Sequence, residues 1–269
     1  MSGVRETEAA SRSVRVRRVE GTRSSSVRDS VAIEAPLNLE LDASLIATTM
    51  RTPGDDESLA LGFAFTEGLL DSFDDVATIE VEHAERDVAR IRTLRGTPRD
   101  GAVRVGTITA ACGACGRLGL EELVASVTPV TSRGVVRAAS IHDAFAALRL
   151  AQPCFDQTGG VHAAGAIAAD GSLLATAEDV GRHNAVDKVV GRLIAGGSLE
   201  LARLLVVSGR PSFEIVHKAI RARLDAVAGV SAPSSLAIEL AERAGLVLCG
   251  FVRDGTMNVY AGSDRLVGD

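Results

Sequence analysis

The hydrophobic pattern along the chain differs between its first and second halves. In the first half, residues 31–41 and 45–52 are typical of extended strands, with Pro36 at an edge or a break. Residues 55–70 repeat apolar side chains at near-helical spacing and predict one helix. Short strands are predicted between residues 76 and 109. This part of the chain is therefore expected to be a mixture of strands and a helix.

In the second half, strands and helices alternate. A helix is predicted at residues 141–151, where Ser140 and Asp143 resemble a capping box, and another follows Asn184, which is expected to act with Asp187 as its cap. The other predicted elements are strands at 161–168, 173–177, 204–207, 226–230, 246–251 and 257–261, and helices at 213–224 and 236–244. This alternation indicates an α/β layer with a largely parallel sheet.

The change of pattern around residues 128–134, which are rich in Thr and Ser and flanked by Pro and Gly, predicts a domain boundary. We expect a disordered Arg- and Ser-rich arm at residues 1–28 and a smaller α+β domain at residues 29–133. An α/β domain is expected at residues 134–269.

Composition limits the classes of protein to consider. The chain has 269 residues, of which 46% are hydrophobic and 24% charged, as in a globular protein. Its net charge of -6 favours neither nucleic acid nor an anionic membrane as a general partner. Four cysteines do not suggest a disulfide framework, and the sequence has neither a 20-residue apolar run nor a secretory signal. We therefore expect a protein of a reducing compartment, the cytoplasm.

The stretch ACGACG contains the pair Cys112 and Cys115, which the pattern places between a strand and a helix. A helix N-terminus favours the thiolate, which attacks sulfur or binds metal. The pair is also compatible with half of a structural zinc site, with a chance pair in a glycine-rich turn, or with a dithiol oxidoreductase. Because two cysteines at this spacing are a weak signal, the remaining motifs must decide among these possibilities.

Small polar loops follow three of the predicted strands. In a parallel sheet these loops collect at one edge, where ligands bind. Their hydroxyl, amide and guanidinium donors suit phosphate, although none is a Walker or Rossmann motif. The candidates are Ser208, Gly209, Arg210, Ser231, Arg253, Gly255 and Thr256.

The segment EDVGRHN at residues 178–184 places two carboxylates, a guanidinium and an imidazole at a strand-to-helix turn. For the carboxylates an ion-paired, capping role is favoured over catalysis. Arg182 and His183 are better candidates for contact with an anionic ligand. His162 is either a buried packing residue or a zinc ligand.

Several motifs in one order resemble the formate dehydrogenase accessory sulfurtransferase family, FdhD. They are ALGFAFTEG from Ala60, CGACG from Cys112, TGGVHAAG from Thr158, EDVGRHNAVDKVVGR from Glu178 and VSAPSSLAIELAERAGLVLCGFVRDG from Val230. The similarity extends from about residue 29 to residue 261.

The resemblance implies a sulfur carrier for formate dehydrogenase. It would take sulfur from a cysteine desulfurase as a persulfide on Cys112, assisted or shielded by Cys115, and deliver it to a molybdenum or tungsten bis(guanine dinucleotide) cofactor. It implies a homodimer and a cytidine deaminase-like, three-layer α/β/α C-terminal domain. GDP-like nucleotides are expected to fit the cofactor site, which we assign to Phe251, Val252, Arg253, Asp254, Gly255, Thr256, Ser231, Arg210 and His183.

Beside the sulfur carrier and the dithiol oxidoreductase named above, two further hypotheses remain. One is a chaperone that binds the molybdenum cofactor without transferring sulfur. The other, a zinc deaminase, is poorly supported because His162 is followed by Ala163 and Ala164, which leaves no glutamate in the HxE pattern. We expect no resident metal, although a non-catalytic zinc on Cys112 and Cys115 is compatible with the sequence.

Overall fold

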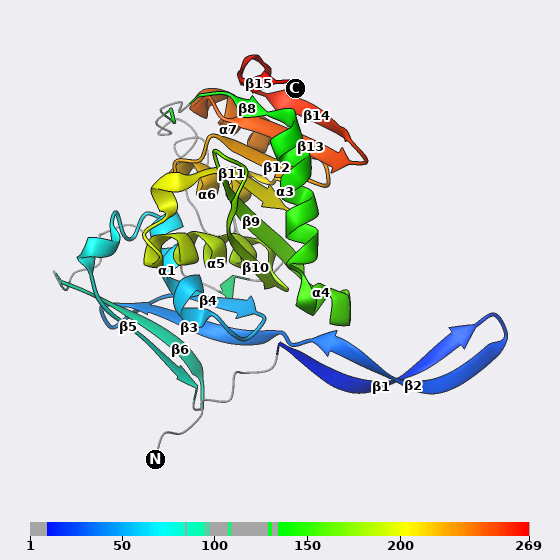
Figure 1. Cartoon of the computed structure of the whole chain (residues 1–269). Helices are drawn as coiled ribbons and strands as arrows, with labels where there is room; N and C mark the ends of the chain where they lie inside the picture. The colour runs from blue at the N-terminus through cyan, green and yellow to red at the C-terminus, as the bar shows by residue number, and fades with distance from the viewer. Residues whose placement is uncertain are drawn as a thin grey trace.

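The computed structural model describes residues 10–83, 85–94, 96, 107–108, 129–130 and 134–268 (Figure 1). The CxxC motif lies outside these residues, as do residues 128 and 131–133 of the predicted domain boundary at 128–134. The division into two domains therefore stays a prediction.

A six-stranded sheet forms the centre of the second half. Its strand order is β10-β9-β11-β12-β13-β14, and β11, β12 and β13 are parallel while the other pairs are antiparallel. The prediction of a largely parallel sheet is thus correct only for its centre. The strands are β9 (His162–Ala168), β10 (Leu173–Asp179), β11 (Ala202–Val207), β12 (Ala226–Gly229), β13 (Val247–Arg253) and β14 (Thr256–Ala261).

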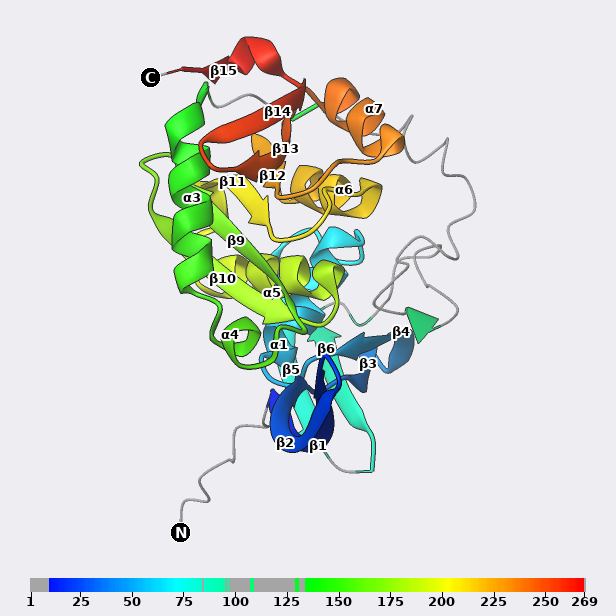
Figure 2. The same ribbon diagram turned by 90° about the vertical axis from the view of Figure 1, so that its right-hand side faces the viewer.

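Helices cover both faces of this sheet, which gives the expected three-layer α/β/α arrangement (Figure 2). Alternation along β11 explains the layers, because successive side chains of a strand point to opposite faces. Leu204 and Val206 pack in one cluster with α3, whereas Leu205 and Val207 pack in the other cluster with α5 and α6. The helices are α3 (Ala138–Leu150), α5 (Arg182–Ala195), α6 (Phe213–Arg221) and α7 (Ser235–Ala244).

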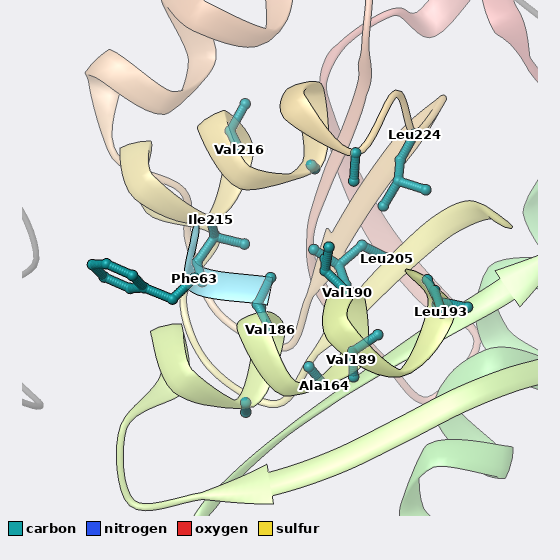
Figure 3. Close-up of a cluster of buried hydrophobic side chains, with 14 of the residues drawn as sticks. Phe63, Ala164, Val186, Val189, Val190, Leu193, Leu205, Ile215, Val216 and Leu224 are labelled. Carbon is teal, nitrogen blue, oxygen red and sulfur yellow. The ribbon is translucent and has the colours of Figure 1, made fainter. Parts of the chain in front are cut away.

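A second sheet has the order β5-β6-β3-β4-β7. Helix α1 lies between this sheet and α5 (Figure 1). Leu39, Phe63 and Val190 share one buried cluster, in which Figure 3 labels Phe63 and Val190. The two halves of the chain are therefore joined by a continuous apolar core. The elements are β3 (Ala35–Leu41), β4 (Ser44–Arg51), α1 (Asp56–Thr66), β5 (Val76–His83), β6 (Asp87–Thr93) and β7 (Thr107–Ile108).

The N-terminal residues differ from the expected disordered arm. Strands β1 (Ser11–Glu20) and β2 (Arg23–Ala32) pair in an antiparallel hairpin that projects from the body (Figure 1). Arginine and valine alternate along β1, and Gly21 takes a positive φ of 61° at the turn. The Arg- and Ser-rich composition concealed this alternation, so the prediction of disorder is wrong for residues 11–28.

Two predicted helix caps are also wrong. Helix α3 begins at Ala138, before Ser140, and α5 begins at Arg182, with Gly181 at its N-cap position. Asn184 lies inside α5, where its side chain bonds Asp179 and the backbone of Met50. Tertiary partners outside the helix thus replace the local capping role that the spacing suggested.

The small elements complete the fold: α4 (Pro153–Thr158), β8 (Val136–Arg137), β15 (Leu266–Val267) and three short 3₁₀ turns, Phe73–Asp75, Leu199–Leu201 and Ser263–Arg265. Among the described residues, no helix combines the length and apolar character needed to cross a membrane.

Candidate functional site

The loop after β11 lies against the ends of two neighbouring strands. Ser208 accepts a hydrogen bond on its Oγ from the Ala163 amide at 2.8 Å and donates its own amide to the Ala163 carbonyl at 2.9 Å. On the other side, a Cβ on Gly229 of β12 would come within 2.6 Å of Pro211 and 2.9 Å of the Gly209 carbonyl oxygen. Only glycine allows this close approach, so the backbone of β12 fixes the loop that carries Arg210.

The next loop lies beside the end of β13. The Phe251 amide donates to the Ser231 carbonyl at 3.4 Å, and a Cβ on Gly250 would meet the same oxygen at 2.9 Å. Because β11, β12 and β13 are parallel, the loops that carry Arg210 and Ser231 lie at the same edge of the sheet. The structure therefore brings these two predicted site residues to one edge.

His162 and Arg182 meet at the loop after β11. A Cβ on Gly209 would lie 3.4 Å from His162 Nδ1 and 3.7 Å from Arg182 Cδ. Burial lowers the pKa of His162, and the neighbouring Arg182 guanidinium and His183 imidazole lower it further. A neutral imidazole beside a guanidinium can accept or donate a hydrogen bond while the guanidinium supplies the charge for an anion.

His183 lies against the N-terminus of helix α6, where the loop after β11 ends. Its side chain is 7% exposed, and its Nε2 lies 3.5 Å from Ser212 Oγ and 3.7 Å from Glu214. Ser212 donates a hydrogen bond to the Glu214 carboxylate at 2.9 Å. The close approach of the His183 imidazole lowers the pKa of Glu214 to about 2. These contacts indicate that His183 holds the first turns of α5 and α6 together.

The predicted stretch from Phe251 to Thr256 forms the end of the β13–β14 hairpin. Phe251 and Asp254 have positive φ angles of 53° and 49°. Thr256 donates its hydroxyl to the Arg253 carbonyl at 2.9 Å. The exposed residues here are Arg253, Asp254, Gly255 and Thr256. Val252 differs from them because its side chain is buried in the core, so only its backbone is available to a ligand.

Both carboxylates of the EDVGRHN segment have structural partners, as the sequence indicated. Glu178 accepts hydrogen bonds from the Cys154 and Phe155 amides, each at 2.8 Å. Asp179 is fully buried and lies 2.8 Å from Lys188 Nζ. Burial raises the pKa of Asp179, and the Lys188 ammonium opposes this shift.

Comparison with known proteins gives the family. A model of the FdhD/NarQ family matches residues 32–267. The chain belongs to this family. A protein of Anaeromyxobacter dehalogenans strain 2CP-1, named sulfur carrier protein FdhD, is 45% identical, and the alignment covers 89% of each chain. Proteins with the same name from Streptomyces avermitilis and Saccharolobus solfataricus are 43% and 40% identical over 88% of this chain, and 89% and 91% of theirs.

A solved structure supports the fold of this FdhD/NarQ family member. A crystal structure described as that of a formate dehydrogenase accessory protein from Desulfotalea psychrophila superposes with a TM-score of 0.78. The match covers 96% of this chain and all of that chain, at 24% sequence identity. The overall α/β fold is therefore shared.

The family motif CGACG itself lies outside the described residues, so the roles of Cys112 and Cys115 stay predictions. The structure does describe the other two cysteines, Cys154 and Cys249, both as free thiols. Within the described ranges, no group of three or more His, Cys, Asp or Glu side chains is arranged to hold a metal ion.

Sequence reasoning missed the buried polar network that joins the two halves of this family member. Lys218 of α6 lies 2.9 Å from Asp187 of α5 and 3.0 Å from Glu67, just after α1. Lys188 of α5 donates to the Thr52 carbonyl at 2.9 Å. The partners of each pair lie up to 151 residues apart, so no local pattern reveals them. The sequence held one signal of this network, because Asp187 lies within the EDVGRHNAVDKVVGR motif.

Proposed function

We propose that this protein is a sulfur carrier that receives sulfur as a persulfide on Cys112 and delivers it to the molybdenum or tungsten bis(guanine dinucleotide) cofactor of formate dehydrogenase. The observation that carries this proposal is its similarity, at 40–45% identity over most of the chain, to proteins named sulfur carrier protein FdhD. The donor in the proposal is a cysteine desulfurase. The sulfur transfer takes place in the cytoplasm.

The two cysteines that the structure describes are poor carriers, which supports the CxxC pair as the sulfur site. Cys249 is fully buried in strand β13, and burial raises its thiol pKa to about 12. Burial also raises the pKa of Cys154, as does the negative charge of Glu178. Because the thiolate is the form that attacks sulfur, both residues are disfavoured near neutral pH.

The first step is a thiol exchange. The Cys112 thiolate attacks the terminal sulfur of the desulfurase persulfide, and a new S–S bond forms on Cys112. The S–S bond of the donor breaks, and its cysteine leaves as a thiolate. No net oxidation occurs, because one persulfide is exchanged for another.

The second step, release of this sulfur as sulfide, needs two electrons. The Cys115 thiolate supplies them by attacking the Cys112 sulfur, which forms a Cys112–Cys115 disulfide and releases HS⁻ to the metal centre. A cellular thiol then reduces the disulfide. This chemistry gives the second cysteine of the motif a defined role and conserves atoms and electrons.

The cofactor is the substrate in this proposal, and its guanine dinucleotide phosphates need cationic and hydrogen-bonding partners. The loops at the carboxyl edge of the sheet supply Arg210 and Ser231, with Arg182 beside the first of them. Arg253 and Thr256 extend the donor set along the exposed end of the β13–β14 hairpin. A GDP-like nucleotide fits the same donors.

Intact mass spectrometry tests the sulfur step. The protein is incubated with a cysteine desulfurase and cysteine, and its mass is measured before and after treatment with a reductant. We expect a gain of one reducible sulfur atom in the native chain and none in Cys112→Ala. Cys115→Ala is expected to gain the sulfur but to release it slowly as sulfide.

The matched controls are Cys154→Ala and Cys249→Ala, which are expected to gain sulfur like the native chain. Sulfur that persists in Cys112→Ala and disappears in Cys154→Ala would exclude Cys112 as the carrier. A native chain that gains no sulfur but binds the guanine dinucleotide cofactor would support the chaperone instead.

A further inference from the structure

The hairpin of β1 and β2 carries a positive charge on an acidic protein. Residues 11–32, here called the hairpin, contain six arginines against one glutamate and one aspartate, whereas the whole chain has a net charge of -6. The family model begins only at residue 32, so nearly all of the hairpin lies outside the part of the chain that the model matches. Charge asymmetry of this kind indicates an anionic partner for the hairpin itself.

The pairing register sorts the side chains of the hairpin onto two different faces. Successive residues of a strand alternate between the faces, and directly opposite residues of an antiparallel pair share one face. Arg15 and Arg17 of β1 therefore lie on the same face as Arg28 of β2, which pairs with Arg15. Both carboxylates of the hairpin, Glu20 and Asp29, lie on the opposite face. Within the described hairpin, the face of the three arginines, here called the Arg/Ser face, has no carboxylate and carries five serines: Ser11, Ser13, Ser24, Ser26 and Ser30.

The arginines of the Arg/Ser face are open to solvent. The side chains of Arg15, Arg17 and Arg28 are all exposed. Arg17 donates a hydrogen bond to the Ser24 hydroxyl at 3.0 Å, and Arg28 donates one to the Ser13 hydroxyl at 3.4 Å. A guanidinium has five N–H donors, so one such bond leaves most of them for a ligand. Because Arg15 and Arg28 are directly opposite, their mutual repulsion favours an anion between them.

The hairpin projects from the body of the molecule as a narrow ribbon (Figure 1). At its base, both strands contact α4, and Ser11 donates a hydrogen bond to Gln157 at 3.3 Å. Neighbouring strands lie about 4.8 Å apart, and the major groove of B-DNA, about 12 Å wide, admits a two-stranded ribbon. The shape of the hairpin therefore suits a DNA duplex.

The residue types on the Arg/Ser face favour phosphate over a protein or a membrane. Arginine and serine are among the side chains that contact phosphate oxygens in protein–DNA complexes. Protein interfaces and membrane-binding surfaces rely instead on apolar and aromatic side chains. Within the described hairpin, Val19, 63% exposed near the tip, is the one large apolar residue on this face. Duplex RNA is disfavoured as well, because its major groove is too deep and narrow for protein side chains.

We propose that the Arg/Ser face of the hairpin binds the phosphate backbone of double-stranded DNA without preference for base sequence. Arg15, Arg17 and Arg28 pair with phosphates, and the serine hydroxyls donate further hydrogen bonds to them. The projection of the hairpin keeps the acidic body away from the duplex (Figure 1). This contact does not depend on the proposed sulfur transfer.

Fluorescence anisotropy of a labelled DNA duplex of mixed sequence, titrated with the full chain, tests the proposal. We expect binding at low salt. The logarithm of the affinity is expected to fall with the logarithm of the salt concentration with a slope of about -3, because three phosphates are neutralised. A second duplex of unrelated sequence is expected to bind with the same affinity, since phosphate contacts carry no sequence information.

A triple variant removes the charges of the Arg/Ser face. It carries Arg15→Gln, Arg17→Gln and Arg28→Gln. This variant is expected to bind the duplex at least about tenfold more weakly than the native chain and to lose most of the salt dependence.

A second triple variant removes the same charge from the opposite face and is the matched control. It carries Arg12→Gln, Arg18→Gln and Arg23→Gln, three positions that are also exposed. Because these arginines point away from the Arg/Ser face, the control is expected to lose less than about threefold in affinity. The comparison separates contact through one face from a general effect of net charge.

Three results would overturn the proposal: a native chain that does not bind the duplex at low salt, an affinity that the Arg/Ser-face substitutions leave unchanged, or equal losses in both variants. Binding to vesicles that contain phosphatidylserine, without binding to the duplex, would assign the hairpin to a membrane instead. Circular dichroism verifies that each variant is folded. Both variants are expected to gain sulfur from a cysteine desulfurase like the native chain, so a failure of DNA binding is distinguishable from a failure of the proposed function.

Discussion

Gly62 of α1 and Gly191 of α5 face each other across the crossing of the two helices. A Cβ on Gly62 would lie 2.9 Å from the Gly191 nitrogen and 2.6 Å from the Asp187 carbonyl carbon. A Cβ on Gly191 would lie 2.7 Å from the Ser58 carbonyl carbon. The two backbones thus touch directly, and this contact holds the first half of the chain against the α/β layer.

Replacing Gly62 with alanine is expected to destabilise the protein by about 3 kcal/mol, because the new methyl group overlaps backbone that cannot rotate away. The better helix propensity of alanine recovers only about 1 kcal/mol of the gross cost. Urea unfolding measures the difference. Gly160→Ala is the control, since its Cβ would make only an ordinary contact of 3.5 Å with Ala32. Equal stability of the two variants would show that α1 and α5 can move apart without a loss of unfolding free energy.

Lys218→Met is expected to cost about 3–5 kcal/mol of unfolding free energy, because it leaves the buried carboxylates of Asp187 and Glu67 without their cation. The control is Arg243→Met, which breaks an exposed pair with Glu239 and is expected to cost less than about 1 kcal/mol. Chemical denaturation at pH 7 compares the two. Similar small losses would mean that water reaches the Lys218 site.

Glu214 contributes a stabilisation that depends on pH. Its pKa is lowered from 4.5 to about 2, chiefly by the neighbouring His183 imidazole, so the folded protein favours the carboxylate. The stabilisation is therefore fully present above pH 4.5 and is lost as the pH falls toward 2, with an upper limit of about 3 kcal/mol.

Comparison with Glu214→Gln measures this contribution. The native chain is expected to be more stable than the variant at pH 6, and the difference is expected to shrink below pH 4.5. Glu239→Gln, at an exposed position, is the control for a surface carboxylate. A difference that stays constant from pH 6 to the acid transition would contradict a depressed pKa at Glu214.

Arg210→Ala and Arg253→Ala are each expected to weaken binding of GDP about tenfold, because each removes a charged donor to phosphate. Isothermal titration calorimetry measures the affinity, and Arg243→Ala provides an arginine control on the remote helix α7. Unchanged affinity of Arg253→Ala would remove the hairpin from the binding site, whereas unchanged affinity of Arg210→Ala would remove the loop after β11.

The sequence by itself determined most elements of the second half and the family. Apolar runs such as residues 204–207 and 226–230 predicted β11 and β12, because buried strands need continuous apolar side chains. The motifs from EDVGRHN to VRDG carried the resemblance to FdhD, which the comparisons confirm. Local patterns sufficed here because they record burial and turn chemistry within a few residues.

Only the tertiary structure decided which polar residues serve folding. Asn184 and Asp187 have the spacing of a helix cap, yet they bond Asp179 and Lys218 inside the core. His183, expected at a ligand, is buried against Glu214. Val252, also expected there, lies in the core. Such roles depend on partners brought together from distant segments, and side-chain hydrogen bonds to those partners outweigh local preferences. The sequence shows which side chains can donate or accept hydrogen bonds, but the folded structure determines which of them pair.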